Sequence, residues 1–125
     1  MQFAVGSSSS TESVNGKTSI PLNTWSHVGA TFDSGGITIY LNGEVDSSGI
    51  VNYTDLSHVQ GVDLKIGSAI GNSFFPGEIE DIQIWDTALS QSEIQQYMNC
   101  PPTGNEAGLV GYWNFEEGSG ITVLD

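Results

Sequence analysis

Basic side chains are almost absent from this sequence. Lys17 and Lys65 stand against fifteen aspartates and glutamates, and the formal net charge of the 125 residues is −13. Nucleic acids and anionic lipids are bound through basic side chains that displace counterions, so the composition excludes nucleic acid as a partner. Such an acidic surface is either simply solvated or attracts hard cations such as Ca²⁺, which prefers oxygen ligands.

Cysteine, histidine and long apolar runs are also scarce. Cys100 is the single cysteine, so no disulfide forms within the chain, although pairing between chains stays open. With only His27 and His58, the sequence has neither a histidine–cysteine metal spacing nor a nucleophilic triad, and His27 is interpreted as a structural hydrogen-bonding residue. No apolar run approaches the ~20 residues that span a membrane, and residues 1–5 lack the basic start of a signal peptide. We therefore predict no membrane insertion.

What the chain does contain is glycine, small polar residues and short alternating apolar segments. A length of 125 residues with 16 glycines fits one domain with one core, and turn signals between short apolar runs favour an all-β fold. Asn15-Gly16 and Asn42-Gly43 tolerate positive φ and are predicted as hairpin turns. The predicted strands cover residues 2–5, 25–33, 37–41, 63–67, 79–85, 109–115 and 121–124, with one further strand and a long loop in 44–61.

Residues 76–97 predict a strand that runs directly into a helix. Ile82 and Ile84 alternate with polar residues, as in a strand with one face in a core, whereas Ile79 falls on the opposite phase. If Ile79 also points inward, one extra residue must be inserted, which predicts a β-bulge near Glu80 and Asp81.

The helix that follows has a start and a stop signal. Ser90 precedes Glu93 by the spacing of a capping box, and Leu89 and Ile94 stand where a hydrophobic staple packs. The two prolines at 101 and 102 cannot continue a helix. We therefore predict one short helix over residues 91–99.

Three segments resemble one family. Residues 75–94, from Phe-Pro-Gly-Glu-Ile-Glu-Asp to Ser-Glu-Ile, resemble the closing segment of laminin-G-like and pentraxin-type jelly rolls of the concanavalin A-like superfamily. Residues 25–33 with 39–43 resemble that family's central hairpin, and residues 108–120 resemble its first strand. The resemblance implies an antiparallel β-sandwich of jelly-roll type with one short helix.

The order of these segments is unusual, because the strand that opens the family's domain comes last. We interpret residues 1–125 as a single laminin-G-like sandwich, in which 1–103 form the later part of a repeat, 104–107 a linker and 108–125 the opening strand of a repeat. A rearranged domain of the same kind is the alternative. In either case the opening and closing strands of this family lie side by side, so residues 109–115 are predicted to pair antiparallel with 79–85.

The resemblance also implies a function. Members of the family are mostly extracellular recognition or adhesion modules, often in tandem, so we predict a non-catalytic module at the cell surface or outside the cell that binds a glycan or an extracellular protein. A homo-oligomer or a neighbouring repeat is a further predicted partner, and a purely structural repeat is the alternative function. Exposed aromatic rings would stack on sugars. Tyr40, Asn72 and Trp85 are the predicted ligand-binding residues, whereas Trp25 and Trp113 are assigned to the core.

A glucanase-like enzyme is the third hypothesis. Retaining β-glucanases of the superfamily carry two carboxylates on one strand face, ~5 Å apart, and Glu78 and Glu80 could supply them. Gln83 stands where a further acid would help, and the expected bulge would split the pair. We therefore predict that the chain is not an enzyme.

Calcium and glycosylation remain open. The pentraxin calcium loop corresponds to residues 67–74, which hold no carboxylate and offer only Asn72 as a ligand. Asp33, Asp63 and Glu78 could instead group at a loop edge. We predict no cofactor and leave a Ca²⁺ site as the weaker alternative. Residues 52–54, Asn-Tyr-Thr, form an acceptor triplet for N-glycosylation in a secretory setting.

Overall fold

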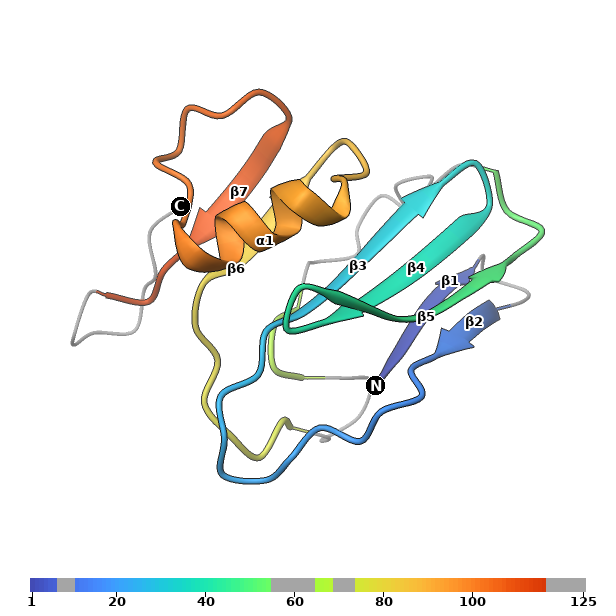
Figure 1. Cartoon of the computed structure of the whole chain (residues 1–125), viewed down its shortest axis with the longest axis horizontal. Helices are drawn as coiled ribbons and strands as arrows, with labels where there is room; N and C mark the ends of the chain where they lie inside the picture. Colours follow the sequence, from blue (N-terminus) through green and yellow to red (C-terminus); the bar gives the residue numbers. More distant parts are fainter. Residues whose placement is uncertain (7–10, 55–64, 69–73, 117–125) are drawn as a thin grey trace. The chain divides into compact units, whose positions relative to one another are not determined.

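The fold is an antiparallel β-structure with one short helix. The computed structural model describes residues 1–6, 11–54, 65–68 and 74–116 (Figure 1). The elements in chain order are β1 Gln2–Gly6, β2 Thr11–Asn15, β3 Val28–Asp33, β4 Gly36–Leu41, β5 Glu44–Ile50, β6 Ile82–Trp85, α1 Gln91–Asn99 and β7 Leu109–Trp113. They form the sheets β1-β2, β3-β4-β5 and β6-β7. The predicted fold class is confirmed at this level, whereas the described strands do not join into a closed jelly roll.

The chain divides into two compact units. The first unit contains Met1–Ser57 and Thr87–Pro101, and the second contains His58–Asp86 and Pro102–Asp125. The first unit therefore holds β1 to β5 and α1, and the second holds β6 and β7. The predicted linker at 104–107 lies inside the second unit.

Two tight turns build the β3-β4-β5 sheet. Ser34 and Gly35 (φ 47° and 90°) connect β3 to β4, and Asn42 and Gly43 (φ 52° and 77°) connect β4 to β5. Positive φ at both central residues is typical of the type I′ turn, whose twist matches that of the flanking strands. The turn predicted at Asn42-Gly43 is confirmed.

The other predicted hairpin turn is wrong. Asn15 ends β2 and pairs with Gln2 at the far end of the β1–β2 ladder, and Gly16 continues the ladder by donating its N–H to the carbonyl of Met1 (2.9 Å). Asn15 and Gly16 do not have the positive φ of such a turn. An Asn-Gly pair permits this turn without requiring it, because both residues also fit extended backbone.

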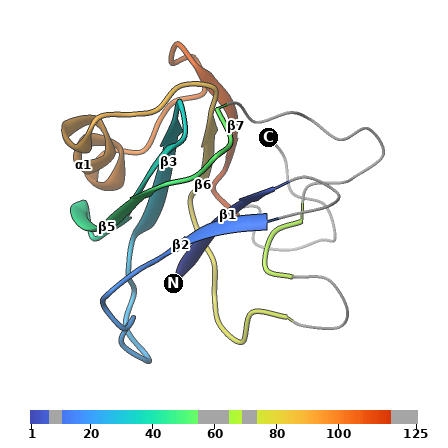
Figure 2. The ribbon, with the colours of Figure 1, turned by 90° about the vertical axis from the view of Figure 1, so that its right-hand side faces the viewer.

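The core of the first unit lies between its two sheets. Ile37 and Ile39 of β4 are 0% and 1% exposed, and they pack with Val5, Val14 and Val51. Seen along the sheet, the β1–β2 hairpin lies on one side of β3-β4-β5 and α1 on the other (Figure 2).

The two sheets approach closely at Gly49 of β5. A Cβ on Gly49 would lie 2.7 Å from a methyl carbon of Val14 on β2. Real Cβ atoms do not approach that closely, so only glycine fits between these two strands without movement.

The helix α1 begins and ends as predicted. The Ser90 side chain accepts from the N–H of Glu93, and the Glu93 carboxylate accepts from the N–H of Ser90 (2.7 Å), which is the predicted capping box. One turn later, the side-chain amide of Gln95 donates to the carbonyl of Gly43 and to the carboxylate of Glu44, both at 3.0 Å. Helix α1 is thereby fixed to the β4–β5 turn.

In the second unit, β6 and β7 pair antiparallel. Ile82 lies opposite Trp113, Gln83 opposite Tyr112 and Ile84 opposite Gly111. The predicted pairing between the last strand and the strand before the helix is confirmed.

Several strand boundaries of the second unit differ from the prediction. Strand β6 begins at Ile82, and its register shift lies between Ile84 and Trp85 rather than near Glu80. Asp81 instead has a φ of 54°, so the chain turns just before the strand. Residues 65–68 form only an isolated bridge from Ser68 to Phe74. The predicted strand at 121–124 lies outside the described residues.

Candidate binding surface

An exposed apolar loop precedes β3 in the first unit. All six residues of 20–25 are exposed, and we call this segment the Trp25 loop. Within it, Trp25 is 61% exposed, Leu22 88% and Ile20 41%. The assignment of Trp25 to the core is therefore wrong. The strand was expected to begin at Trp25, whereas β3 begins at Val28. Trp25 therefore lies outside the strand, and the alternation of side chains along a strand does not determine its orientation.

Hydrogen bonds fix both ends of the Trp25 loop. Before it, the backbone N–H groups of Lys17 and Thr18 donate to the carboxylate of Asp46, at 2.7 and 3.0 Å. After it, the N–H of His27 donates to the side-chain oxygen of Asn42 (2.9 Å), and the N–H of Asn42 donates to the carbonyl of His27 (2.8 Å). A loop held at both ends loses less conformational entropy when it binds a ligand.

A bulge in β5 aims Asp46 at the loop. Ile39 pairs with Ser47 and Tyr40 pairs with Val45, which leaves Asp46 as the extra residue. A bulge redirects a side chain out of the regular alternation. The hydrogen bond from the Thr18 side chain and those from the backbone of Lys17 and Thr18 lower the pKa of Asp46, so its carboxylate stays ionised in this role.

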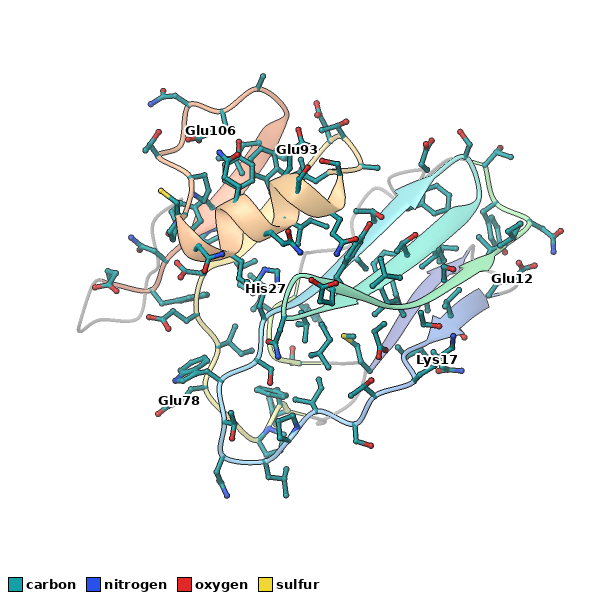
Figure 3. All side chains as sticks on the ribbon, in the orientation of Figure 1. Glu12, Lys17, His27, Glu78, Glu93 and Glu106 are labelled. Carbon is teal, nitrogen blue, oxygen red and sulfur yellow. The ribbon has the colours of Figure 1, made fainter. Side chains whose placement is uncertain are left out.

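A second carboxylate ties β2 to the end of β5. Glu12 lies on β2 (Figure 3). Its carboxylate accepts hydrogen bonds from the backbone N–H and from the side-chain amide of Asn52, both at 2.7 Å. These hydrogen bonds lower the pKa of Glu12. The predicted glycosylation residue is thus exposed with its amide already hydrogen-bonded, and its modification stays a prediction.

The residues predicted to bind a ligand do not form one site within a unit. Tyr40 is 6% exposed, on the face of β4 opposite Ile37 and Ile39 and on the same side of the sheet as α1 (Figure 2). Stacking on a sugar needs an accessible ring, so this burial speaks against Tyr40 as a contact. Trp85 is half-buried on β6 of the second unit, and Asn72 lies outside the described residues.

The acidic segment before β6 has no strand geometry. Glu78 and Glu80 are exposed, and no regular element covers residues 76–81. The next carboxylate, Asp81, accepts a hydrogen bond from the hydroxyl of Tyr112 (2.7 Å). Burial and this carboxylate raise the pKa of Tyr112 to about 12. The placement of Glu78 and Glu80 on one strand face, on which the glucanase hypothesis depended, is therefore wrong.

Two of the predicted cation ligands belong to different units. Asp33 belongs to the first unit and Glu78 to the second, and Asp63 lies outside the described residues. Among the described residues, no three histidine, cysteine, aspartate or glutamate side chains are grouped to hold a metal ion. In the same part of the chain, no helix is long and apolar enough to cross a membrane.

His27 is the one described histidine, and it lies directly before β3 (Figure 3). Burial lowers the pKa of His27, so its ring is neutral near pH 7. Within the described chain, its Nδ1 atom and the nearby Ser26 hydroxyl are buried without a hydrogen-bond partner. The backbone of His27, rather than its ring, makes the contacts that hold the loop.

Comparison with known proteins decides the family. The laminin-G family model Laminin_G_3, described as "Concanavalin A-like lectin/glucanases superfamily", matches residues 1–95. The chain belongs to this superfamily. The resemblance read from the sequence is therefore confirmed. The superfamily implies a jelly-roll sandwich. The described residues of this laminin-G-like chain form small antiparallel sheets that do not close into one.

One solved structure is similar to this chain. The laminin-G-like chain is similar to the crystal structure of an S-layer domain-containing protein from Clostridium thermocellum ATCC 27405, with a TM-score of 0.55 and 26% sequence identity. The match covers 76% of this chain and 49% of that one, so this chain spans about half the length of that structure. No curated protein matches the chain.

Proposed function

We propose that this laminin-G-like chain is a non-catalytic recognition module of the cell surface that binds glycan through the Trp25 loop. The observation that carries the proposal is the exposed indole of Trp25, presented with Leu22 and Ile20 on a loop that is hydrogen-bonded at both ends. A large apolar surface left exposed on a soluble protein is typical of a binding site. The likeness to an S-layer domain-containing protein supports a place at the cell surface.

The chemistry of the loop suits a sugar ring. A pyranose presents an apolar face of C–H groups and an edge of hydroxyls, and a tryptophan ring covers the first while nearby polar groups bind the second. Asn23 and Thr24 lie beside Trp25, and the Thr24 hydroxyl contacts the carbonyl of Leu22 (3.4 Å). These are neutral donors and acceptors, as hydroxyl recognition requires.

Charge selects the class of glycan. A net charge of −13 with two lysines repels sulfated and uronic-acid polymers at low salt. The ligand class is therefore a neutral glycan. Glu78 and Glu80 are exposed on a segment without strand geometry, which supports recognition without hydrolysis, because retaining hydrolysis needs two facing carboxylates.

A glycan array tests the proposal. The wild-type chain, Trp25→Ala and Phe75→Ala are applied to neutral and acidic glycans with and without Ca²⁺. Phe75 is the matched control, since it is an exposed aromatic residue of the second unit. We expect binding to neutral glycans that Trp25→Ala loses and Phe75→Ala keeps.

Three outcomes would contradict this function. Binding that survives in Trp25→Ala would remove the role of the loop, and no binding to any glycan would favour the purely structural repeat. Release of reducing sugar that disappears in Glu78→Gln would instead show an enzyme.

A further inference from the structure

The outer edge of β3 is an unpaired sheet edge in the first unit. Strand β3 is the terminal strand of the sheet β3-β4-β5, and no described strand pairs with its other side. Such an edge presents a row of backbone donors and acceptors to another strand. Residues 28–32 carry no charge and no proline, the features that commonly block pairing at an edge.

The β3–β4 register shows which backbone groups face outward. Asp33 pairs with Gly36 across the tight turn, and the carbonyl of His27 accepts from the N–H of Asn42 at the other end. Hydrogen-bonded and non-hydrogen-bonded pairs alternate along an antiparallel ladder, so Gly29 and Thr31 also bond to β4. The N–H and C=O groups of Val28, Ala30 and Phe32 therefore point to the open edge.

The apolar face of the same sheet is also open at β3. On β3, Phe32 lies opposite the buried Ile37 and packs against the core, whereas Ala30, opposite the buried Ile39, and Val28, opposite Leu41, are exposed, Val28 to 49%. Apolar side chains on the sheet face that packs against the core are normally buried by neighbouring elements. No described strand pairs with the backbone of this edge, and Val28 and Ala30 on it are exposed.

We propose that this edge pairs with the β3 edge of a second copy of the chain, antiparallel about a two-fold axis at Ala30. The outward-facing N–H and C=O groups belong to the even-numbered residues 28, 30 and 32. Each of these residues must therefore lie opposite an even-numbered residue of the second copy. Ala30 opposite Ala30 of the second copy, with Val28 opposite its Phe32 and Phe32 opposite its Val28, uses all of them. This register forms about six hydrogen bonds, more than either neighbouring even register.

Side-chain chemistry agrees with the same register. It places His27 opposite Asp33 of the second copy, and Asp33 opposite its His27. A facing histidine and aspartate form a donor–acceptor pair across strands, and each pair occurs twice about the axis. The exposed Val28 and the partly buried Phe32 also become an apolar cross-strand pair.

The net charge opposes association at a distance. Two copies with −13 each repel at low ionic strength, and salt screens this repulsion. Dimerisation is therefore expected to strengthen as salt rises from about 50 mM to about 500 mM.

Sedimentation velocity combined with amide exchange by NMR tests the dimer. We expect a monomer–dimer equilibrium in which the amides of Val28, Ala30 and Phe32 become protected as concentration rises, whereas those of Gly29 and Thr31 are protected throughout. A chain that stays monomeric at millimolar concentration would overturn the proposal. So would protection of the even amides at every concentration, because it would show that another strand of the same chain covers the edge.

Ala30→Pro is the first variant, because it removes the two central hydrogen bonds and leaves the bonds to β4 in place. We expect the dissociation constant to rise at least about tenfold, or about 1.4 kcal/mol, because two hydrogen bonds of the interface are lost. Ala30→Val is its control, because it keeps the N–H group.

Asp33→Lys is the second variant and does not depend on the folding of Ala30→Pro. If Asp33 faces His27 of the second copy, this variant weakens the dimer. It does so even though it makes the net charge less negative, which by itself would favour association. Asp86→Lys changes the charge equally in the second unit and should strengthen association. Equal strengthening by both variants would contradict the register.

Discussion

Gly49→Ala should destabilise the first unit through one steric contact. The new Cβ would lie 2.7 Å from one methyl carbon of Val14, 3.6 Å from the other and 3.7 Å from its Cβ. Val14 is buried and β-branched, so its χ1 cannot rotate freely, and overpacking of this kind costs about 1–3 kcal/mol. The backbone entropy that glycine loses on folding offsets about 0.5–1 kcal/mol. The net loss of about 1–2 kcal/mol lowers the melting temperature by about 4–8 °C.

Urea unfolding followed by far-UV circular dichroism measures this loss. Gly29→Ala is the matched control, since a Cβ at Gly29 meets only ordinary contacts of 3.7 and 3.9 Å, and it should be neutral or slightly stabilising. Val14→Ala removes the crowded methyl groups, so the double variant Val14→Ala/Gly49→Ala should show coupling of about 1 kcal/mol or more. If Gly49→Ala and Gly29→Ala have the same unfolding midpoint, the close approach of the two sheets is refuted.

Three further changes test local contacts. Ser90→Ala removes the N-cap of α1 and should cost about 1 kcal/mol in urea unfolding; an unchanged midpoint would exclude the cap. The pKa of Glu12 is lower in the folded than in the unfolded state. Its contribution to the free energy of unfolding is therefore present above the unfolded-state pKa and is lost as the pH falls through the folded-state pKa. Stability measured from about pH 6 to about pH 3 should therefore fall less steeply in Glu12→Gln than in the wild type, and parallel curves would contradict this. A chain that ends at Glu106 lacks β7 and exposes the edge of β6, so it should aggregate or melt lower, whereas an unaltered melting temperature would make β7 dispensable.

Local sequence signals predicted the elements that local chemistry determines. The capping box at Ser90 and the turn at Asn42-Gly43 need only side chains and φ angles within a few residues. Asn15-Gly16 has the same turn signal, yet it continues the β1–β2 ladder because strand pairing overrides a permissive turn. The β6–β7 pairing was predicted from the family resemblance, since no local signal in either strand names its partner.

The candidate site was harder to predict. Trp25 was assigned to a strand that starts three residues later, so its exposure was missed. Pro21 and Asn23 were the available signals, because both favour a turn and Asn23 has a φ of 57°. Tyr40 was expected on an outward face, but it is buried, and the side of the sheet on which it lies also carries α1, which is distant in sequence. The role of the bulge at Asp46 could not be predicted either, since its carboxylate bonds Lys17 and Thr18 across the fold.

The central claim is that Trp25 carries glycan recognition. Isothermal titration calorimetry with the neutral glycan bound best on the array compares the wild type, Trp25→Ala and Phe75→Ala under identical salt. We expect Trp25→Ala to weaken the affinity at least about tenfold, or about 1.4 kcal/mol, and Phe75→Ala to match the wild type. Equal affinities of the wild type and Trp25→Ala would contradict the account.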